Sequence, residues 1–158
     1  MKFPYSTGQI PIYYNRRKSG RGHQGFYKDI TSDPLYPFGH GLSYTEFKYG
    51  TVTPSVTKVK RGDRLSVEVT VTNVGARDGA ETVHWFISDP YCSITRPVKE
   101  LKHFEKQLIR AGETKTFRFD IDLERDFGFV NEDGKRFLEA GEYHILVQGQ
   151  TVKIELID

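Results

Sequence analysis

Residues 64–74 alternate strictly between apolar and polar side chains, and this pattern limits the possible folds more than any other feature of the sequence. Leu65, Val67, Val69 and Val71 would share one side of an extended backbone, with serine, glutamate and threonine on the other. Side chains of a β-strand point to alternate faces, whereas an α-helix repeats about every 3.6 residues. The stretch therefore predicts a strand with one buried face and one solvated face.

Short segments of the same kind recur through the second half of the chain, with turn residues about every ten residues between them. Asp133-Gly134 is a strong hairpin signal within this series. In 80–88, Val83, Trp85 and Ile87 share a face, so we interpret Trp85 as a core residue. The expected strands are 51–59, 64–74, 80–88, 98–109, 114–123, 127–130, 135–138, 143–148 and 152–156. The series predicts an all-β, antiparallel sandwich over residues 46–158, near the usual size of about 100 residues.

Residues 1–45 have a different composition. Pro4, Gly8 and Pro11 interrupt the apolar and aromatic residues of the first fifteen, and residues 16–35 are rich in arginine, lysine, glycine and serine. Such a pattern is too broken for a helix and suits an extended stretch that lies along another surface. We therefore expect an extended linker ahead of the sandwich.

Charge and cysteine content exclude several classes of function. Residues 1–35 hold six basic and two acidic side chains, whereas residues 36–158 hold seventeen and nineteen, so the sandwich is not a basic nucleic-acid-binding surface. The single cysteine forms no internal disulfide, and no Cys or His pair has zinc-ligand spacing. No apolar run approaches the roughly 20 residues of a membrane span. We expect no nucleic-acid partner, no membrane partner, no metal and no cofactor.

Several motifs together resemble one family. Residues 36–47 (YPFGHGLSYTEF) resemble the segment that leads into the C-terminal fibronectin type III-like domain of family 3 glycoside hydrolases, the β-glucosidase and β-xylosidase group. The other matching stretches are 3–15, which resembles the end of the family's preceding α/β domain, 69–75, 96–104 and 140–143. The resemblance implies a fibronectin type III or immunoglobulin-like sandwich at 46–158, and a linker with the tail of the α/β domain at 1–45.

The resemblance also implies a function. In that family the nucleophilic aspartate belongs to an N-terminal barrel and the acid/base carboxylate to the α/β domain, so no catalytic residue transfers to a position here. Met1 directly precedes a segment that resembles the middle of a domain, which indicates a start inside a longer protein. The chain is then a non-catalytic accessory domain that packs against the catalytic domains of its parent chain. The parent would be a periplasmic or secreted hydrolase of terminal β-linked sugars.

Aromatic residues of the linker region are the candidate contact residues, because apolar rings without a core of their own mark a contact surface. The residues expected to contact the neighbouring domain are Phe3, Tyr5, Tyr13, Tyr14, Tyr36, Phe38 and Tyr44.

Three other motifs resemble active or ligand sites less well. Asp120 and Asp122 would lie about 6.6 Å apart on a strand, a spacing that suits an inverting glycosidase, but their neighbours place them on a solvated face. Residues 20–25 match G-x-G-x-x-G without the flanking strand and helix of a dinucleotide site. Residues 131–134 resemble part of a calcium loop, yet Ala140 stands where its bidentate glutamate belongs.

Two alternatives stay open at this point. The chain could be an independent module that binds carbohydrate or protein through exposed Tyr91, Phe26 and Tyr27, with weak carbohydrate contact. Tyr143, after an Ala-Gly-Glu turn, could form a tyrosine corner or be an ordinary core tyrosine.

Overall fold

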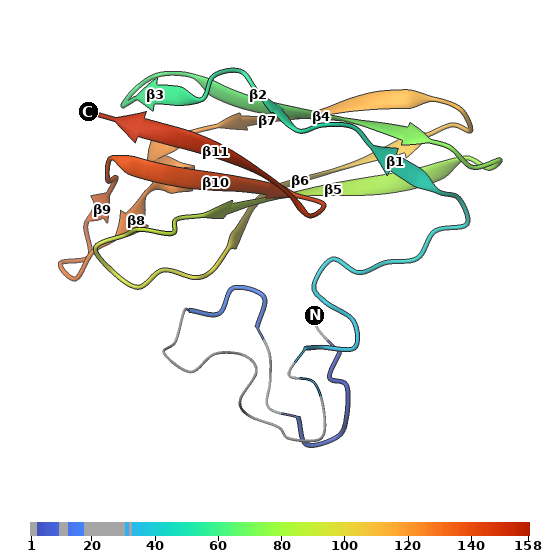
Figure 1. The fold of residues 1–158 in the computed structure, drawn as a ribbon, viewed down its shortest axis with the longest axis horizontal. Helices are drawn as coiled ribbons and strands as arrows, with labels where there is room; N and C mark the ends of the chain where they lie inside the picture. Colours follow the sequence, from blue (N-terminus) through green and yellow to red (C-terminus); the bar gives the residue numbers. More distant parts are fainter. Residues whose placement is uncertain (1–2, 10–12, 18–30, 32) are drawn as a thin grey trace.

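The computed structural model describes residues 3–9, 13–17, 31 and 33–158 (Figure 1). Two facing sheets enclose one apolar core, which confirms the all-β sandwich expected from the sequence. The described residues before β1 run outside the two sheets, along one side of the molecule (Figure 1).

The first sheet is built around strand β4, the segment with the clearest alternation. Its strands are β1 (Phe47–Tyr49), β2 (Thr53–Pro54), β4 (Leu65–Asn73) and β7 (Thr114–Ile121). Strand β4 pairs with β1 and β2 along one edge and with β7 along the other, always antiparallel. The register sets Val67 opposite Phe119 and Val69 opposite Phe117, so the buried faces coincide.

The second sheet has five strands in the order β3-β11-β10-β5-β6. Its strands are β3 (Lys58–Lys60), β5 (Gly79–Ser88), β6 (Glu100–Ile109), β10 (Gly141–Val147) and β11 (Gln150–Ile157). All neighbours are antiparallel except β3 and β11, which are parallel. A π-helical turn (Leu123–Phe127) and a small hairpin of β8 (Phe129–Val130) and β9 (Arg136–Phe137) complete the described elements.

The core fills the space between the two sheets. Val71, Phe117 and Ile145 are fully buried there, and so is Trp85, which confirms its interpretation as a core residue. Burial alternates along β4 and β7 in the two-residue period that the sequence shows. Removing these side chains from water is the main stabilising contribution to the fold.

The tyrosine-corner interpretation is confirmed. The Tyr143 hydroxyl donates a hydrogen bond of 2.8 Å to the Glu139 carbonyl, four residues back along the chain. Its ring stacks on Phe127 with centroids 4.2 Å apart. The bond satisfies the hydroxyl of a tyrosine whose ring is buried, so it holds the start of β10 against the π-helical turn.

The predicted single strand at 51–59 is wrong in one respect, because the chain changes sheets within it. Thr53 and Pro54 pair with β4, whereas Lys58 to Lys60 pair with β11 in the other sheet. Pro54 has no amide hydrogen to continue the ladder. The strand ends there, and the next three residues cross between the sheets.

Candidate interdomain surface

The N-terminal segment is attached to the outer face of the five-stranded sheet by a cluster of rings. Tyr14 stacks on Phe38 with centroids 4.3 Å apart. Both rings meet Phe86 of β5 edge-on, at 5.9 Å and 6.2 Å. Phe38 also meets His84, and the Lys99 ammonium lies 4.6 Å from the Phe86 centroid. Phe86 points away from the core and is nevertheless buried, because this cluster covers it.

Backbone hydrogen bonds add to this attachment. The Val98 amide donates to the Arg16 carbonyl at 2.8 Å, next to a bridge between Arg17 and Pro97. Further out, Phe3 and Tyr36 form an antiparallel bridge with an edge-to-face ring contact at 6.0 Å. Within the described residues, the segment is thus held by separate local contacts.

Gln9 joins parts of the segment that are far apart in sequence. Its side chain is buried and accepts a bond of 2.6 Å from the Tyr5 amide. Its Nε2 donates to the carbonyls of Thr31 and Asp33, each at 3.2 Å. Sequence reasoning missed Gln9, because a single amide in an irregular segment has no periodic signal.

The structure divides the seven predicted contact residues into two groups. Tyr14 and Phe38 are partly buried and face the sheet of the same domain, which the sequence did not foresee. The other five are exposed, and Tyr44 is the most accessible, with 92% of its surface exposed. The exposed predicted residues are Phe3, Tyr5, Tyr13, Tyr36 and Tyr44. These five rings are accessible at the surface of the described structure.

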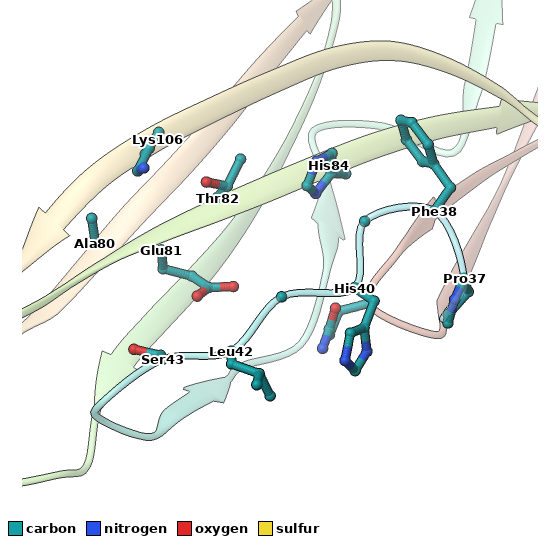
Figure 2. Close-up of a pocket in the computed structure, with 13 residues that line it drawn as sticks. Pro37, Phe38, His40, Leu42, Ser43, Ala80, Glu81, Thr82, His84 and Lys106 are labelled. Atoms are coloured by element: carbon teal, nitrogen blue, oxygen red, sulfur yellow. The ribbon is translucent and has the colours of Figure 1, made fainter. Parts of the chain in front are cut away.

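A groove of about 700 Å³ lies between residues 37–43 and the outer face of β5 (Figure 2). Phe38, Glu81, His84 and Lys106 are among the residues that line it. Glu81 is the single acidic residue in the described lining, whereas glycoside hydrolysis uses two carboxylates. The described lining of the groove therefore does not contain the carboxylate pair of a glycosidase.

Glu81 is also occupied by a contact with the opposite sheet. Its carboxylate accepts a hydrogen bond of 2.6 Å from the Tyr49 hydroxyl. Burial, together with this carboxylate, raises the pKa of Tyr49 far above its ordinary value. Tyr49 therefore remains a hydrogen-bond donor, and the pair ties β1 to β5.

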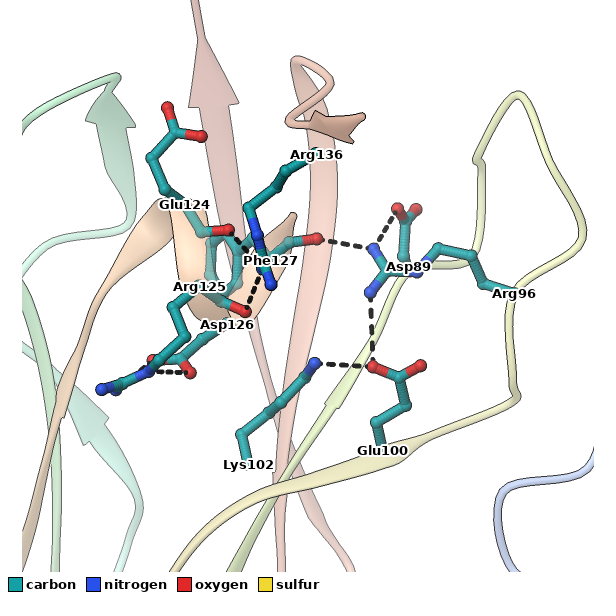
Figure 3. A network of polar contacts seen from close by, with 9 residues as sticks. All are labelled: Asp89, Arg96, Glu100, Lys102, Glu124, Arg125, Asp126, Phe127 and Arg136. Carbon is teal, nitrogen blue, oxygen red and sulfur yellow. Dashed lines mark hydrogen bonds and ion pairs between the residues drawn. The ribbon is translucent and has the colours of Figure 1, made fainter. Parts of the chain in front are cut away.

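A buried arginine organises the loop that receives the N-terminal segment (Figure 3). Arg96 Nη1 donates to Asp89 at 3.1 Å and to the Phe127 carbonyl at 2.7 Å. Its Nη2 lies 3.5 Å from Glu100, which also binds Lys102 at 2.7 Å. The network fixes the conformation of residues 89–100, including the Val98 amide that binds the linker.

Sequence reasoning missed Arg96 as a network centre. In the sequence, Arg96 is only the first residue of the family-like stretch 96–104. Its partners lie seven, thirty-one and four residues away, on separate parts of the fold. No local pattern could indicate them.

Asp120 and Asp122 do not form a catalytic pair in this structure. Asp120 is exposed and binds Arg118 at 2.8 Å. Asp122 lies beyond the end of β7, where its side chain caps the π-helical turn by accepting from the Arg125 amide at 3.0 Å. Both carboxylates therefore have structural partners on an open surface.

A third aspartate nearby is buried and paired. The Asp126 carboxylate accepts two hydrogen bonds of 2.9 Å from Nε and Nη2 of Arg125. It also accepts a hydrogen bond of 3.0 Å from the Asp122 amide. Hydrogen bonds and charge from Asp126 raise the pKa of Arg125. The three bonds fix the π-helical turn, whose Phe127 carbonyl then meets Arg96.

The other residues and motifs considered as possible ligand sites lie on loops and turns or outside the described residues. Tyr91 is 79% exposed on the 89–97 loop, whereas Phe26, Tyr27 and the 20–25 glycine motif lie outside the described residues. The Asn131 side chain accepts from two amides of its own turn, those of Asp133 and Lys135. Among the described residues, no helix is long and apolar enough to cross a membrane.

Comparison with known proteins finds similarity to parts of longer enzymes. Residues 81–151 match the family model of the fibronectin type III-like domain. The chain is 37% identical to a periplasmic β-glucosidase of Salmonella typhimurium, over 98% of this chain and 21% of that protein. It is 38% identical to a β-xylosidase of Formosa agariphila, over 93% of this chain and 20% of that protein. The chain thus spans about a fifth of the length of these relatives.

A solved structure is similar over the whole chain. The crystal structure of a β-glucosidase from Listeria innocua in complex with glucose aligns with a TM-score of 0.91 and 37% identity. The alignment covers 100% of this chain and 24% of that one. The similarity therefore includes the N-terminal segment as well as the sandwich.

Proposed function

Since this chain belongs to the fibronectin type III-like domains at the C-terminal end of family 3 β-glucosidases and β-xylosidases, we propose that it packs against the catalytic domains of its parent chain. It has no catalytic residue of its own. The parent protein hydrolyses terminal β-linked sugars, in the periplasm or after secretion. The relatives' names and their greater length support these assignments.

One observation carries the proposed packing role. Five aromatic side chains of the N-terminal segment remain exposed, although rings of the same segment are seated on the sheet. Exposed apolar rings in one region favour contact with a partner over solvent. The proposed contact residues are Phe3, Tyr5, Tyr13, Tyr36 and Tyr44.

The proposed boundary between linker and sandwich lies at residue 46. Immediately before it, the Thr45 hydroxyl donates to the buried Asn73 side chain at 2.6 Å, so Thr45 is the last linker residue that contacts the body. A chain of residues 46–158 should still unfold cooperatively, because the core lies within it. Loss of a cooperative thermal transition would assign the linker to the core.

The packing role can be tested with Tyr44→Ser in the full-length gene product. This change should lower the melting temperature of the catalytic domains, because it removes an apolar contact between domains. In the 158-residue chain it should change nothing, since Tyr44 is exposed there. Tyr91→Ser, at an exposed position on a different loop, is the matched control. An unchanged melting temperature for Tyr44→Ser in the full-length protein would contradict the packing role.

The absence of catalysis has a separate test. Purified 158-residue chain should hydrolyse aryl β-glucosides and β-xylosides no faster than buffer. Turnover that disappears in Asp122→Ala would overturn this expectation.

A second candidate function rests on the exposure of Tyr91, whose ring lies free for stacking. The chain would then bind carbohydrate as an independent module. Titration with cello- and xylo-oligosaccharides decides, because a saturable shift that Tyr91→Ala abolishes would support the module. If no oligosaccharide causes a shift, carbohydrate binding is contradicted and the packing role is the remaining candidate.

A further inference from the structure

The outer side of β6 presents an exposed apolar row next to the groove. Phe104 and Leu108 are 60% and 57% exposed, and Lys106 lies between them. All three point away from the core, because Ile109, one position out of phase, is fully buried. Strand β6 is the last strand of its sheet, so this row lies near an open edge.

The strand register connects this row to the groove. Phe104 lies opposite His84, Lys106 opposite Thr82 and Leu108 opposite Ala80. Directly opposed residues of an antiparallel pair share one face. His84, Thr82, Ala80 and Lys106 all line the groove, and Phe104 and Leu108 flank it on the same face of the sheet, on either side of Lys106 along β6.

An exposed leucine lines the other side of the groove, and an exposed tyrosine follows it in the chain. Leu42 lines it and is 95% exposed, and Tyr44 follows two residues later. A Cβ on Gly79 would meet Ser43 and Thr45, so this stretch lies directly against the start of β5. The result is a polar groove between two apolar ridges, Leu42 with Tyr44 and Phe104 with Leu108.

We propose that these two ridges and the groove form a docking surface for the catalytic domains of the same polypeptide, with Lys106 paired to a carboxylate of those domains. The inference rests on the proposed function and extends its contact surface from the linker to β6. The relatives carry about four times as much chain outside the matched region. The segment preceding the sandwich crosses this same side of the molecule (Figure 1).

Charge favours that occupant over a second copy of this chain. Lys106 makes no ion pair within the described residues, although it lies at the centre of the surface. In a two-fold interface a residue at the axis meets its own copy, so two copies docked with the axis through the centre of this surface would bring their Lys106 ammonium groups together. A partner that carries a carboxylate between apolar residues instead complements both the charge and the ridges.

Oxidative footprinting with mass spectrometry tests the proposal by comparing the 158-residue chain with the full-length gene product. Phe104, Leu108, Leu42 and Tyr44 should label strongly in the short chain and lose most of that labelling in the full-length protein. Tyr91 on its separate loop should label equally in both and serves as the control.

The outcomes separate this inference from the proposed function. Protection of Tyr44 with Phe104 and Leu108 as reactive as before would overturn the β6 surface and keep the packing role. Unchanged labelling at all four residues would overturn both. Concentration-dependent protection in the short chain, with a dimer by sedimentation, would identify a second copy as the occupant and also overturn the inference.

The charge component has its own variant. Lys106→Glu should lower the melting temperature of the full-length protein and leave that of the short chain unchanged. Lys48→Glu, an exposed charge reversal on β1 of the other sheet, is the matched control. Equal melting temperatures of the two variants in the full-length protein would contradict the assigned role of Lys106.

Discussion

The sandwich and the N-terminal segment are stabilised in different ways. The sandwich has a continuous core in which Val71, Trp85 and Ile145 are fully buried. The segment instead depends on a few discrete contacts, chiefly the Tyr14–Phe38 stack and the Gln9 side chain. The difference teaches that a core change should affect the whole domain, whereas a change in the segment should release that segment alone.

The largest effect is expected for Trp85→Ala. Truncation of a fully buried large ring should lower the free energy of unfolding by about 3–5 kcal/mol. Its Nε1 has no hydrogen-bond partner in the described structure, so the loss is one of apolar packing. Urea titration followed by circular dichroism measures it. Ile145→Val, which folds more readily, should cost about 0.5–1.5 kcal/mol. A loss below 1 kcal/mol for Trp85→Ala would remove the distinction between the two regions.

A comparable loss of stability is expected for Arg96→Met. This change tests the network that links the sandwich to the N-terminal segment. The Arg96 and Asp89 side chains are only 6% and 4% exposed, so the change leaves a buried carboxylate without its cation. Breaking such a pair costs about 3–5 kcal/mol. Lys58→Met, which breaks the exposed pair with Glu155, should cost only about 0–1 kcal/mol.

Amide exchange sharpens the same test. The Val98 amide, which binds the Arg16 carbonyl, should lose its protection in Arg96→Met under conditions where β4 stays protected. Equal stability of the Arg96 and Lys58 variants would contradict the network.

A smaller and local effect is expected for Phe38→Ala. The change removes a ring stack worth about 0.5–1.5 kcal/mol. Limited proteolysis of residues 3–45 should speed up, while the melting temperature of the sandwich should fall by no more than about 5 °C. Tyr13→Ala, at an exposed ring of the same segment, should alter neither measurement. Cooperative loss of the whole sandwich in Phe38→Ala would show that the segment belongs to the core.

The smallest effect concerns Cys92, in the loop between the two regions. Burial raises the pKa of its thiol to about 11 from 9.0. The folded state therefore holds this proton more tightly, and the stability so gained is lost as the pH rises from about 9 to about 11. Alkylation by iodoacetamide at pH 8 should be slower in the folded chain than in urea, because the thiolate reacts and less of it is present in the folded chain. Equal rates would show an open loop.

The sequence predicts the strands well because alternation is local. Val69 and Trp85 each belong to a run whose period alone identifies the buried face. The sheet change after Pro54 could not be predicted, because it depends on β11, about a hundred residues later. Pro54 indicated an edge strand, but it did not indicate that the following residues join the other sheet.

The candidate surface could be predicted only in part. Rings in the linker indicated a contact, but their direction depends on Phe86, whose outward position follows from the packing of β5. Arg96 and Gln9 act through carbonyls and carboxylates distributed over the fold. Hydrogen-bond partners so far apart in the chain leave no periodic pattern in the sequence.

The parallel pairing of β3 with β11 has a consequence for synthesis on the ribosome. Lys58 pairs with Glu155, so β3 has no partner in its sheet until β11 has been made. Contacts so distant in sequence also slow folding, because a long loop must close before they form. The five-stranded sheet is therefore completed at its β3 edge only after β11 has been made, whereas the β5–β6 pair that carries Phe104 and Leu108 can form earlier.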